Sequence, residues 1–249
     1  MTPTLDIAAD GVATLTLNRP QHLNRLHRED LLALQAHFAR LQNEPAARVL
    51  VLTGQGRAFC AGYHIGEIDG PEDPHFFERT VDALEALALP TIARLNGSVY
   101  GGATDLALAC DFRVGVTGME LRMSAARLGL HYYPSGLVRY VSRLGLPAAK
   151  RLFLLAENLP ADELQRIGYL DALVAPEALD AEVARIVALL GGNAPLAVRG
   201  MKQSLNELAR GEFDVAKVRQ REAVCATSDD LREGLAAFAE RRAPRFRGC

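Results

Sequence analysis

Two glycine-containing stretches hold residues whose types and spacing could do chemistry. Residues 56–65 read GRAFCAGYHI, and residues 96–111 read NGSVYGGATDLALACD. Glycine lets the backbone approach another group closely, because no Cβ blocks the way. A helix that opens at Gly102 would also present unpaired N–H groups and its positive dipole end to a developing negative charge. The alternative is that Gly101 and Gly102 only permit tight packing between a strand and a helix.

Polar side chains with acid or base character follow these stretches. Residues 128–136 read LGLHYYPSG and place His131, Tyr132 and Tyr133 side by side. Each of these side chains could face a pocket, or it could pack in a core or at a subunit contact. Cys60 is expected to be a packed thiol rather than a nucleophile, because the sequence shows no base paired with it.

The elements that must position these residues alternate between strands and helices. Apolar runs predict strands over residues 12–17, 48–53, 90–95 and 111–116. Helical spacing of apolar residues predicts helices over 28–42, 76–87 and 102–108. From Pro147 onward the pattern is almost entirely helical, over 148–156, 160–167, 178–190, 195–210, 213–226 and 229–241. We therefore expect an α/β core followed by a helical tail, with residues 66–74 as a mobile surface loop.

Composition limits the class of protein. The chain has 249 residues, 49% of them hydrophobic, and a formal net charge of -2, which suits a soluble enzyme and argues against a nucleic-acid or membrane-surface binder. The four cysteines lie far apart, so no disulfide framework and no metal site are expected. We see no signal peptide and no apolar run of membrane-spanning length, which predicts a cytoplasmic protein with reduced thiols.

Together the two stretches resemble the oxyanion-hole segments of the crotonase (enoyl-CoA hydratase/isomerase) superfamily, and the similarity runs nearly end to end. The resemblance implies a fold of repeated ββα units in a spiral over residues 1–190, followed by a C-terminal helical trimerisation region over 191–249. It implies a homotrimer or a dimer of trimers. It also implies that the main-chain amides of Tyr63 and Gly102 bind the oxygen of a thioester enolate.

The same resemblance implies an acyl-CoA substrate and no permanently bound cofactor. Coenzyme A, as part of that substrate, would lie along Gln21, His22 and Leu23 and along Ala61, Tyr63, His64 and Ile65. Arg19 and Arg25 are candidate phosphate partners. Arg139 stands where hydratases also have arginine and is expected to brace a helix or a subunit contact.

The chain departs from the family at its catalytic glutamates. Asp105 stands at the first glutamate position, where it could act as the retained acid–base group or could only complement the helix dipole. The second glutamate position aligns with Ala125, which carries no proton, so we expect neither two-glutamate hydration nor the isomerisation that relies on the second glutamate. Tyr132 and His64 resemble, in part, the pocket residues of the methylmalonyl-CoA decarboxylase branch, although His64 stands one place later than the histidine of that branch.

Three functions are compatible with these residues. The first is an acyl-CoA lyase of the superfamily that works through a stabilised enolate but not through two-glutamate hydration. The second is a decarboxylase of malonyl- or methylmalonyl-type thioesters, in which Tyr132 holds the carboxylate and His64 or water protonates the carbon. The third is a non-catalytic acyl-CoA-binding relative, and a thioester or β-diketone hydrolase is a minor further possibility.

Overall fold

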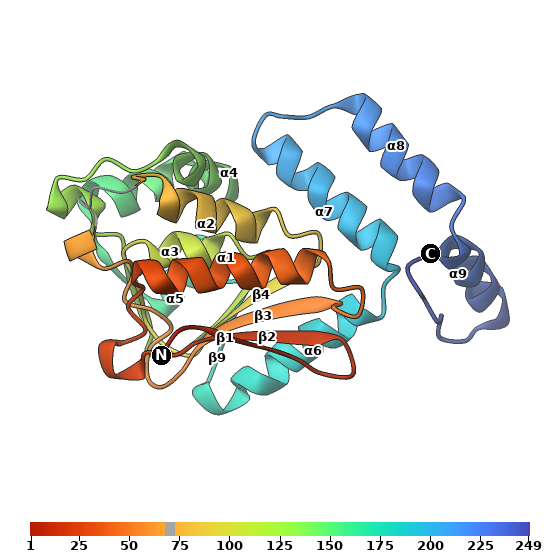
Figure 1. The fold of residues 1–249 in the computed structure, drawn as a ribbon, viewed down its shortest axis with the longest axis horizontal. Helices are drawn as coiled ribbons and strands as arrows, with labels where there is room; N and C mark the ends of the chain where they lie inside the picture. The colour runs from red at the N-terminus through yellow and green to blue at the C-terminus, as the bar shows by residue number, and fades with distance from the viewer. Residues whose placement is uncertain (68–72) are drawn as a thin grey trace.

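A computed structural model describes residues 1–67 and 73–249. Its main sheet has six strands in the order β1-β2-β3-β4-β6-β9, and a second sheet has three strands in the order β5-β7-β8. β1 and β2 are antiparallel, and the other neighbours in the main sheet are parallel. Figure 1 places α1, α2 and α3 on one side of the main sheet and α6 on the other. The predicted α/β core is therefore confirmed.

The strands and helices have the following bounds. The strands are β1 (Thr4–Ile7), β2 (Val12–Leu17), β3 (Val49–Gly54), β4 (Thr91–Leu95), β5 (Val99–Tyr100), β6 (Phe112–Val116), β7 (Glu120–Arg122), β8 (Asn158–Pro160) and β9 (Ala172–Val174). The α-helices are α1 (Arg28–Gln42), α2 (Phe76–Glu85), α3 (Ala103–Leu108), α4 (Pro134–Lys150), α5 (Ala161–Arg166), α6 (Leu179–Gly191), α7 (Pro195–Ala209), α8 (Val215–Ala226) and α9 (Asp229–Glu240).

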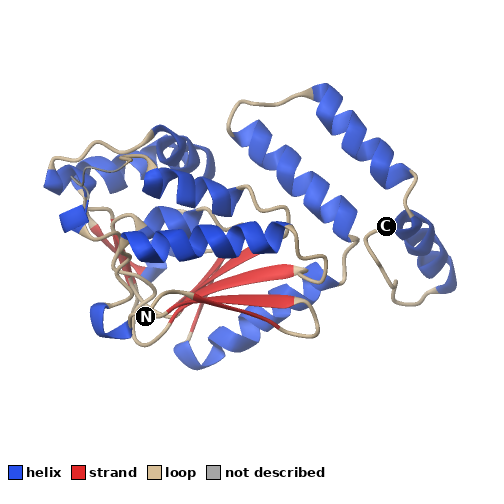
Figure 2. Ribbon diagram, in the orientation of Figure 1, coloured by secondary structure: helices blue, strands red, loops and turns tan. Residues whose placement is uncertain are grey.

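Burial explains why the longer elements could be predicted. All six residues of β3 are buried, as expected for a continuous apolar run between parallel neighbours. In β2 fully and partly buried residues alternate, as its sequence does. α1 buries Leu31, Leu34, Phe38 and Leu41, which repeat at helical spacing. Figure 2 shows this arrangement of strands under helices.

A repeated unit connects the two sheets. β4 of the main sheet continues into β5 of the small sheet and then into α3, and β6 and β7 repeat this path before the 3₁₀ helix Ala125–Leu128. Each repeat carries the chain from the main sheet to the small sheet and then into a helix. This is the ββα succession that the resemblance implies.

The helical pattern predicted after Pro147 is confirmed for α5 to α9, but this part of the chain is not entirely α-helical. β8 and β9 lie in that part, and residues Arg151–Leu155 form a π-helix. β1, β5, β7 and the start of α4 were also missed. Strands of two to four residues are too short to show a period. At Gly145, with φ of +78° and ψ of +159°, the backbone leaves the helical conformation, so α4 consists of two helical stretches joined by a kink just before Pro147. Of the predicted loop over 66–74, residues 68–72 lie outside the described residues.

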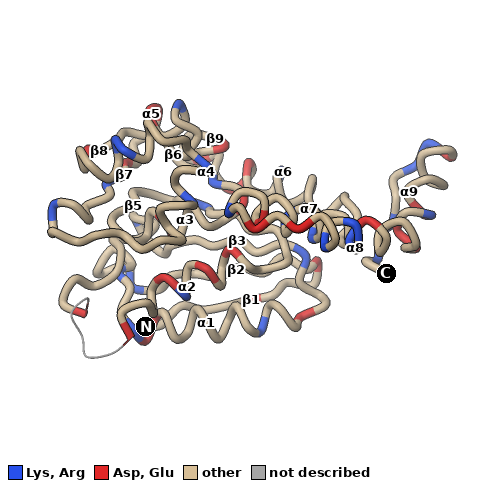
Figure 3. Tube along the Cα trace, turned by 90° about the horizontal axis from the view of Figure 1, so that it is seen from above, with Lys and Arg blue, Asp and Glu red and all other residues tan. Residues whose placement is uncertain are grey.

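The last three helices extend away from the sheet, as Figures 1 and 3 show. α7 is fastened to the core by Lys202, whose Nζ lies 2.7 Å from Asp111 Oδ2 and donates to the Leu89 carbonyl at 2.9 Å. α8 and α9 follow, and a groove of about 770 Å³ lies between α7, α8 and α9. Both signs of charge are spread over the core and these helices in Figure 3.

No single helix among residues 1–67 and 73–249 has the length and apolarity to cross a membrane. One pair of helices, Pro176–Gly191 and Pro195–Ala209, is long and apolar enough when the two are taken together, but the pair is bent by 105°.

Candidate active site

The two glycine-containing stretches lie side by side in the structure. The amide of Phe59 donates to the Ser98 carbonyl at 3.2 Å, and the amide of Tyr100 donates to the Cys60 carbonyl at 3.0 Å. Cys60 and Val99 form a parallel bridge between them. These contacts fix the two stretches in register, so that the residues that follow each stretch also come together.

Gly62 and Gly102 meet at the end of this register. Gly62 has a φ of +92°, and a Cβ there would lie 2.7 Å from the Tyr100 carbonyl oxygen and 3.3 Å from the Gly102 nitrogen. Both the backbone conformation and the lack of space therefore require glycine at position 62. The chain places the first predicted oxyanion segment directly against the amide of the second.

The main-chain amides of Tyr63 and Gly102, which would form the predicted oxyanion hole, are positioned by the neighbouring hydrogen bonds. Leu26 pairs with the residues on either side of Tyr63: its amide donates to the Gly62 carbonyl, and its carbonyl accepts from the His64 amide, both at 2.8 Å. Among the described residues, the Gly102 amide has no backbone acceptor, while the Gly102 carbonyl begins α3 by accepting from Asp105 and Leu106. Gly102 therefore stands at the N-terminus of α3, with its nitrogen beside Gly62.

Asp105 is a fully buried carboxylate with two unlike oxygens. Its Oδ2 accepts from Arg139 Nη1 at 2.7 Å and from the Tyr133 hydroxyl. Its Oδ1 is buried and has no hydrogen-bond partner among the described residues. Burial raises the pKa of Asp105 above its usual value, although Arg139 and the Tyr133 hydroxyl act in the opposite direction. One oxygen is thus held in place by two donors, and the other is not.

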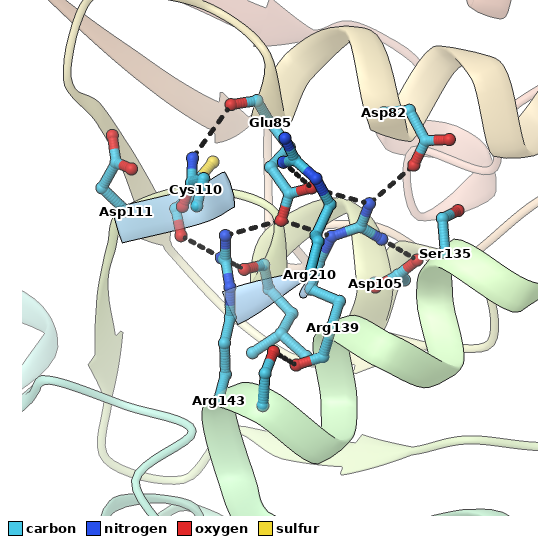
Figure 4. Close-up of polar contacts among 12 residues, drawn as sticks. Asp82, Glu85, Asp105, Cys110, Asp111, Ser135, Arg139, Arg143 and Arg210 are labelled. Atoms are coloured by element: carbon cyan, nitrogen blue, oxygen red, sulfur yellow. Dashed lines mark hydrogen bonds and ion pairs between the residues drawn. The ribbon is translucent and has the colours of Figure 1, made fainter. Parts of the chain in front are cut away.

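A buried ion-pair network supports this carboxylate, as Figure 4 shows. Arg139 on α4 also binds Glu85 through Nε at 3.0 Å and Asp82 through Nη2 at 2.7 Å. Glu85 in turn accepts from Arg143 at 2.8 Å and from Arg210 at 3.4 Å. Burial alone would raise the pKa of Glu85, but the charges of Arg139 and Arg143 hold that pKa below its usual value. Arg139 therefore braces α2 and α3 within the subunit.

Phe77 on α2 connects the two halves of the site. Its ring lies 5.6 Å from the ring of Tyr63 and 6.1 Å from the ring of Tyr133, centroid to centroid. A Cβ on Gly102 would lie 2.7 Å from the tip of the Phe77 ring. Phe77 thus covers Gly102 and joins it to the Tyr133–Asp105 pair. Neither Phe77 nor the bond from Arg139 to Asp105 was predicted from the sequence.

The neighbouring tyrosines differ in position. Tyr132 is only 8% exposed, stacks on Tyr133 at 4.2 Å and packs on Phe153 at 5.0 Å. Its hydroxyl donates to the Tyr133 hydroxyl at 3.1 Å, so Tyr133 stands between Tyr132 and Asp105. Burial and the nearby Asp105 charge raise the pKa of both tyrosines well above the usual value. His131 is exposed, with Nδ1 2.8 Å from the Tyr132 carbonyl oxygen.

The structure groups the predicted catalytic residues in two places. In the first place, Phe77 and Tyr133 connect Tyr63, Gly102 and Asp105. Tyr132 contacts this group through Tyr133. The imidazole of His64 instead packs against that of His27, with centroids 4.7 Å apart. The structure thus separates the contacts of His64 from those of Tyr132.

The predicted coenzyme A segments also lie next to each other. The amide of Ala61 donates to the Leu23 carbonyl at 2.8 Å. Gln21, His22 and Ile65 are exposed. Arg19, a candidate phosphate partner, forms ion pairs with Asp30 and Glu29. The exposed side chains therefore lie along two backbone segments that are held together.

Two further positions fit the sequence argument. Cys60 is fully buried, its Sγ lies 3.0 Å from the Asn24 carbonyl oxygen, and burial raises the pKa of its thiol to about 12. Such a thiol is not a nucleophile at neutral pH. Ala125 is 6% exposed and opens a 3₁₀ helix, so the second glutamate position carries a buried methyl group.

Comparison with known proteins points to one family. The sequence model of the enoyl-CoA hydratase/isomerase family matches residues 8–249. The crotonyl-CoA hydratase of Syntrophomonas wolfei is 31% identical over 246 residues, which cover 95% of each chain. The 1,2-epoxyphenylacetyl-CoA isomerase of Escherichia coli is 29% identical and covers 96% of this chain and 95% of its own. The crystal structure of an enoyl-CoA hydratase from Bacillus anthracis superposes with a TM-score of 0.90 at 29% identity, over 100% of both chains. This chain therefore belongs to the enoyl-CoA hydratase/isomerase family and has the crotonase fold.

Proposed function

We propose that this enzyme moves a proton on an acyl-CoA thioester through an enolate, with Asp105 as its single acid–base group. The observation that carries the proposal is the buried Asp105 carboxylate, with Oδ2 held by Arg139 and Tyr133 and Oδ1 without a partner among the described residues. A base held in one orientation and shielded from water is suited to transferring the same proton twice.

The reaction that fits one base is migration of a double bond. Asp105 Oδ1 would take a proton from the carbon next to the thioester of a 3-enoyl-CoA. The electron pair of that C–H bond would form the enolate, whose oxygen would accept hydrogen bonds from the Tyr63 and Gly102 amides. Oδ1 would then return the proton to the γ-carbon and leave a 2-enoyl-CoA. Hydration through two carboxylates would lack its second group, because Ala125 occupies that position.

Decarboxylation is supported less well by the contacts of Tyr132. That hydroxyl already donates to Tyr133, and its ring is packed against Phe153. A substrate carboxylate placed beside Tyr133 would also come close to the Asp105 carboxylate, and two like charges in a buried site repel each other. We therefore prefer proton transfer over the decarboxylase and the non-catalytic alternatives.

A panel of thioesters in D₂O tests the proposal. With 3-enoyl-, 2-enoyl- and methylmalonyl-CoA, mass spectrometry would follow deuterium entering the acyl chain, absorbance would follow double-bond migration, and trapping would follow CO₂. We expect migration and deuterium exchange, and a loss of roughly 10²–10⁴-fold in Asp105→Asn, the usual contribution of a general acid–base group.

Asp180→Asn is the matched control, because its carboxylate is 83% exposed and binds only Arg94 among the described residues. This variant should keep the full rate. Release of CO₂ without migration would establish the decarboxylase instead. Tight binding with neither exchange nor CO₂ would indicate a non-catalytic relative, and full activity of Asp105→Asn would refute the role of Asp105.

A further inference from the structure

Three potential metal ligands converge beside the predicted coenzyme A segments. His27 Nδ1 lies 2.7 Å from Glu67 Oε1, and the rings of His27 and His64 are tilted by 55° with centroids 4.7 Å apart. One ligand atom from each of His27, His64 and Glu67 lies within 4.8 Å of the other two. The side chain of His27 is 22% exposed and that of Glu67 is 31% exposed, so an ion could reach them from solvent.

The backbone around these ligands is fixed before any ion binds. The His64 amide donates to the Leu26 carbonyl at 2.8 Å, one residue before His27. Glu67 Oε2 accepts from the Arg28 amide at 2.8 Å, which orients its carboxylate. His64 Nε2 lies 3.3 Å from the place where a Cβ on residue 66 would stand, and Gly66 leaves that space open. In known metal sites, a hydrogen bond to a ligating carboxylate, such as that from the Arg28 amide to Glu67, orients the carboxylate.

The donor set indicates which ion would bind. Two imidazoles and one carboxylate form the His₂Glu combination that binds zinc in proteins, with a fourth position left for water or a ligand. Imidazole ligands favour zinc, nickel and cobalt over magnesium and calcium, which prefer oxygen ligands.

We propose that His27, His64 and Glu67 form a binding site for a divalent transition-metal ion of the zinc class. The cysteine spacing gave no sign of this site, because none of its ligands is a thiol. A bound ion would join the start of α1 to the segment that carries Tyr63. The alternative is that Glu67 only satisfies the first amides of α1, as carboxylates at helix N-termini do.

Metal titration of the untagged full-length chain distinguishes the two. Zn²⁺ would be followed by calorimetry and Co²⁺ by its visible d–d absorption. We expect one saturable ion per chain. His64→Asn and Glu67→Gln should each lower the metal affinity by more than about tenfold, because losing even a residue that only hydrogen-bonds to a metal ligand typically lowers affinity by about tenfold or more. Glu67→Gln keeps an oxygen that can accept from the Arg28 amide, so α1 should keep its start.

The controls remove other possible ligands. His131→Asn and Cys249→Ser change an exposed imidazole and an exposed thiol elsewhere on the chain and should bind as the parent does. His75→Asn removes an exposed histidine that contacts Glu78 at 3.2 Å and should also leave binding unchanged. Thermal unfolding without metal checks that each variant is folded. Equal affinity in folded His64→Asn, or no saturable binding by the parent, would overturn the proposal.

Discussion

Asp105 and Tyr133 form the pair on which the chemistry of the proposed site depends. The Tyr133 hydroxyl donates to Asp105 Oδ2, and Tyr132 contacts this pair only through Tyr133. The hydrogen bond favours the charged carboxylate and so lowers the pKa of Asp105, against the burial that raises it. Replacing either tyrosine by phenylalanine keeps the ring and removes only the hydroxyl.

We predict that Tyr133→Phe shifts the acid limb of the pH–rate profile to higher pH. A base must be deprotonated, so the rate falls as the pH drops through the pKa of Asp105. Removing a donor to the charged form raises that pKa, and the fall then begins at a higher pH. Tyr132→Phe should leave the limb nearly unchanged. Profiles of kcat/KM for the two variants check this, and a larger shift in Tyr132→Phe would contradict our assignment of their positions.

For single residues, the sequence could predict Asp105 as a candidate acid–base group but could not predict which side chains bind it. The resemblance places Asp105 at a catalytic position by counting three residues from Gly102. Arg139 lies 34 residues later and Tyr133 28 residues later, so only the packing of α3 against α4 brings them to the carboxylate. A linear motif cannot show which of two adjacent tyrosines faces inward when they lie in a loop without a period.

Between elements, the parallel course of residues 57–62 and 97–102 positions the site. Main-chain hydrogen bonds join the two segments, and glycine is required where they come closest. The longer strands and helices could be predicted because each buries a face that its sequence displays. The short strands of the small sheet could not, because their pairing is with residues distant in sequence.

We predict that Gly62→Ala destabilises the protein more than Gly102→Ala. At Gly62 the positive φ alone costs roughly 1–2 kcal/mol for a residue with a Cβ, and that Cβ would collide with the Tyr100 carbonyl. At Gly102 the φ is -59° and the added Cβ would meet only the tip of the Phe77 ring, which can rotate away. Urea unfolding measures both, and equal midpoints would show that the contact at Gly62 is not required.

For the whole molecule, the unusual feature is the apolar surface of the last three helices. Phe238 is 87% exposed, Leu235 64%, Leu205 64% and Val215 60%. Large exposed apolar patches on a soluble protein usually mark a surface that a partner covers. The amphipathic pattern of these helices was visible in the sequence, but whether another part of the same chain covered them was not.

We predict that the chain forms a trimer or a dimer of trimers through α7, α8 and α9. Light scattering should give a mass of three or six times the 27.0 kDa of one chain. A charge on an exposed apolar residue, as in Leu235→Glu, should lower that mass, whereas Leu154→Glu, on the equally exposed π-helix of the core, should not. A stable parent monomer at micromolar concentration would refute this assembly.

The thiol of Cys60, a buried residue within the first glycine-containing stretch, can react with a reagent only when that stretch opens. Burial raises the thiol pKa of Cys60 and of Cys110 to about 12, so neither offers a thiolate to an alkylating reagent at neutral pH. Cys249 is exposed and Cys225 half-buried. Iodoacetamide should therefore label Cys249 first in the native protein, and Cys60 only when the segments that hold Tyr63 and Gly102 come apart. Peptide mapping over time would give the rate of that separation, and early labelling of Cys60 would mean that the two segments part far more readily than their hydrogen bonds indicate.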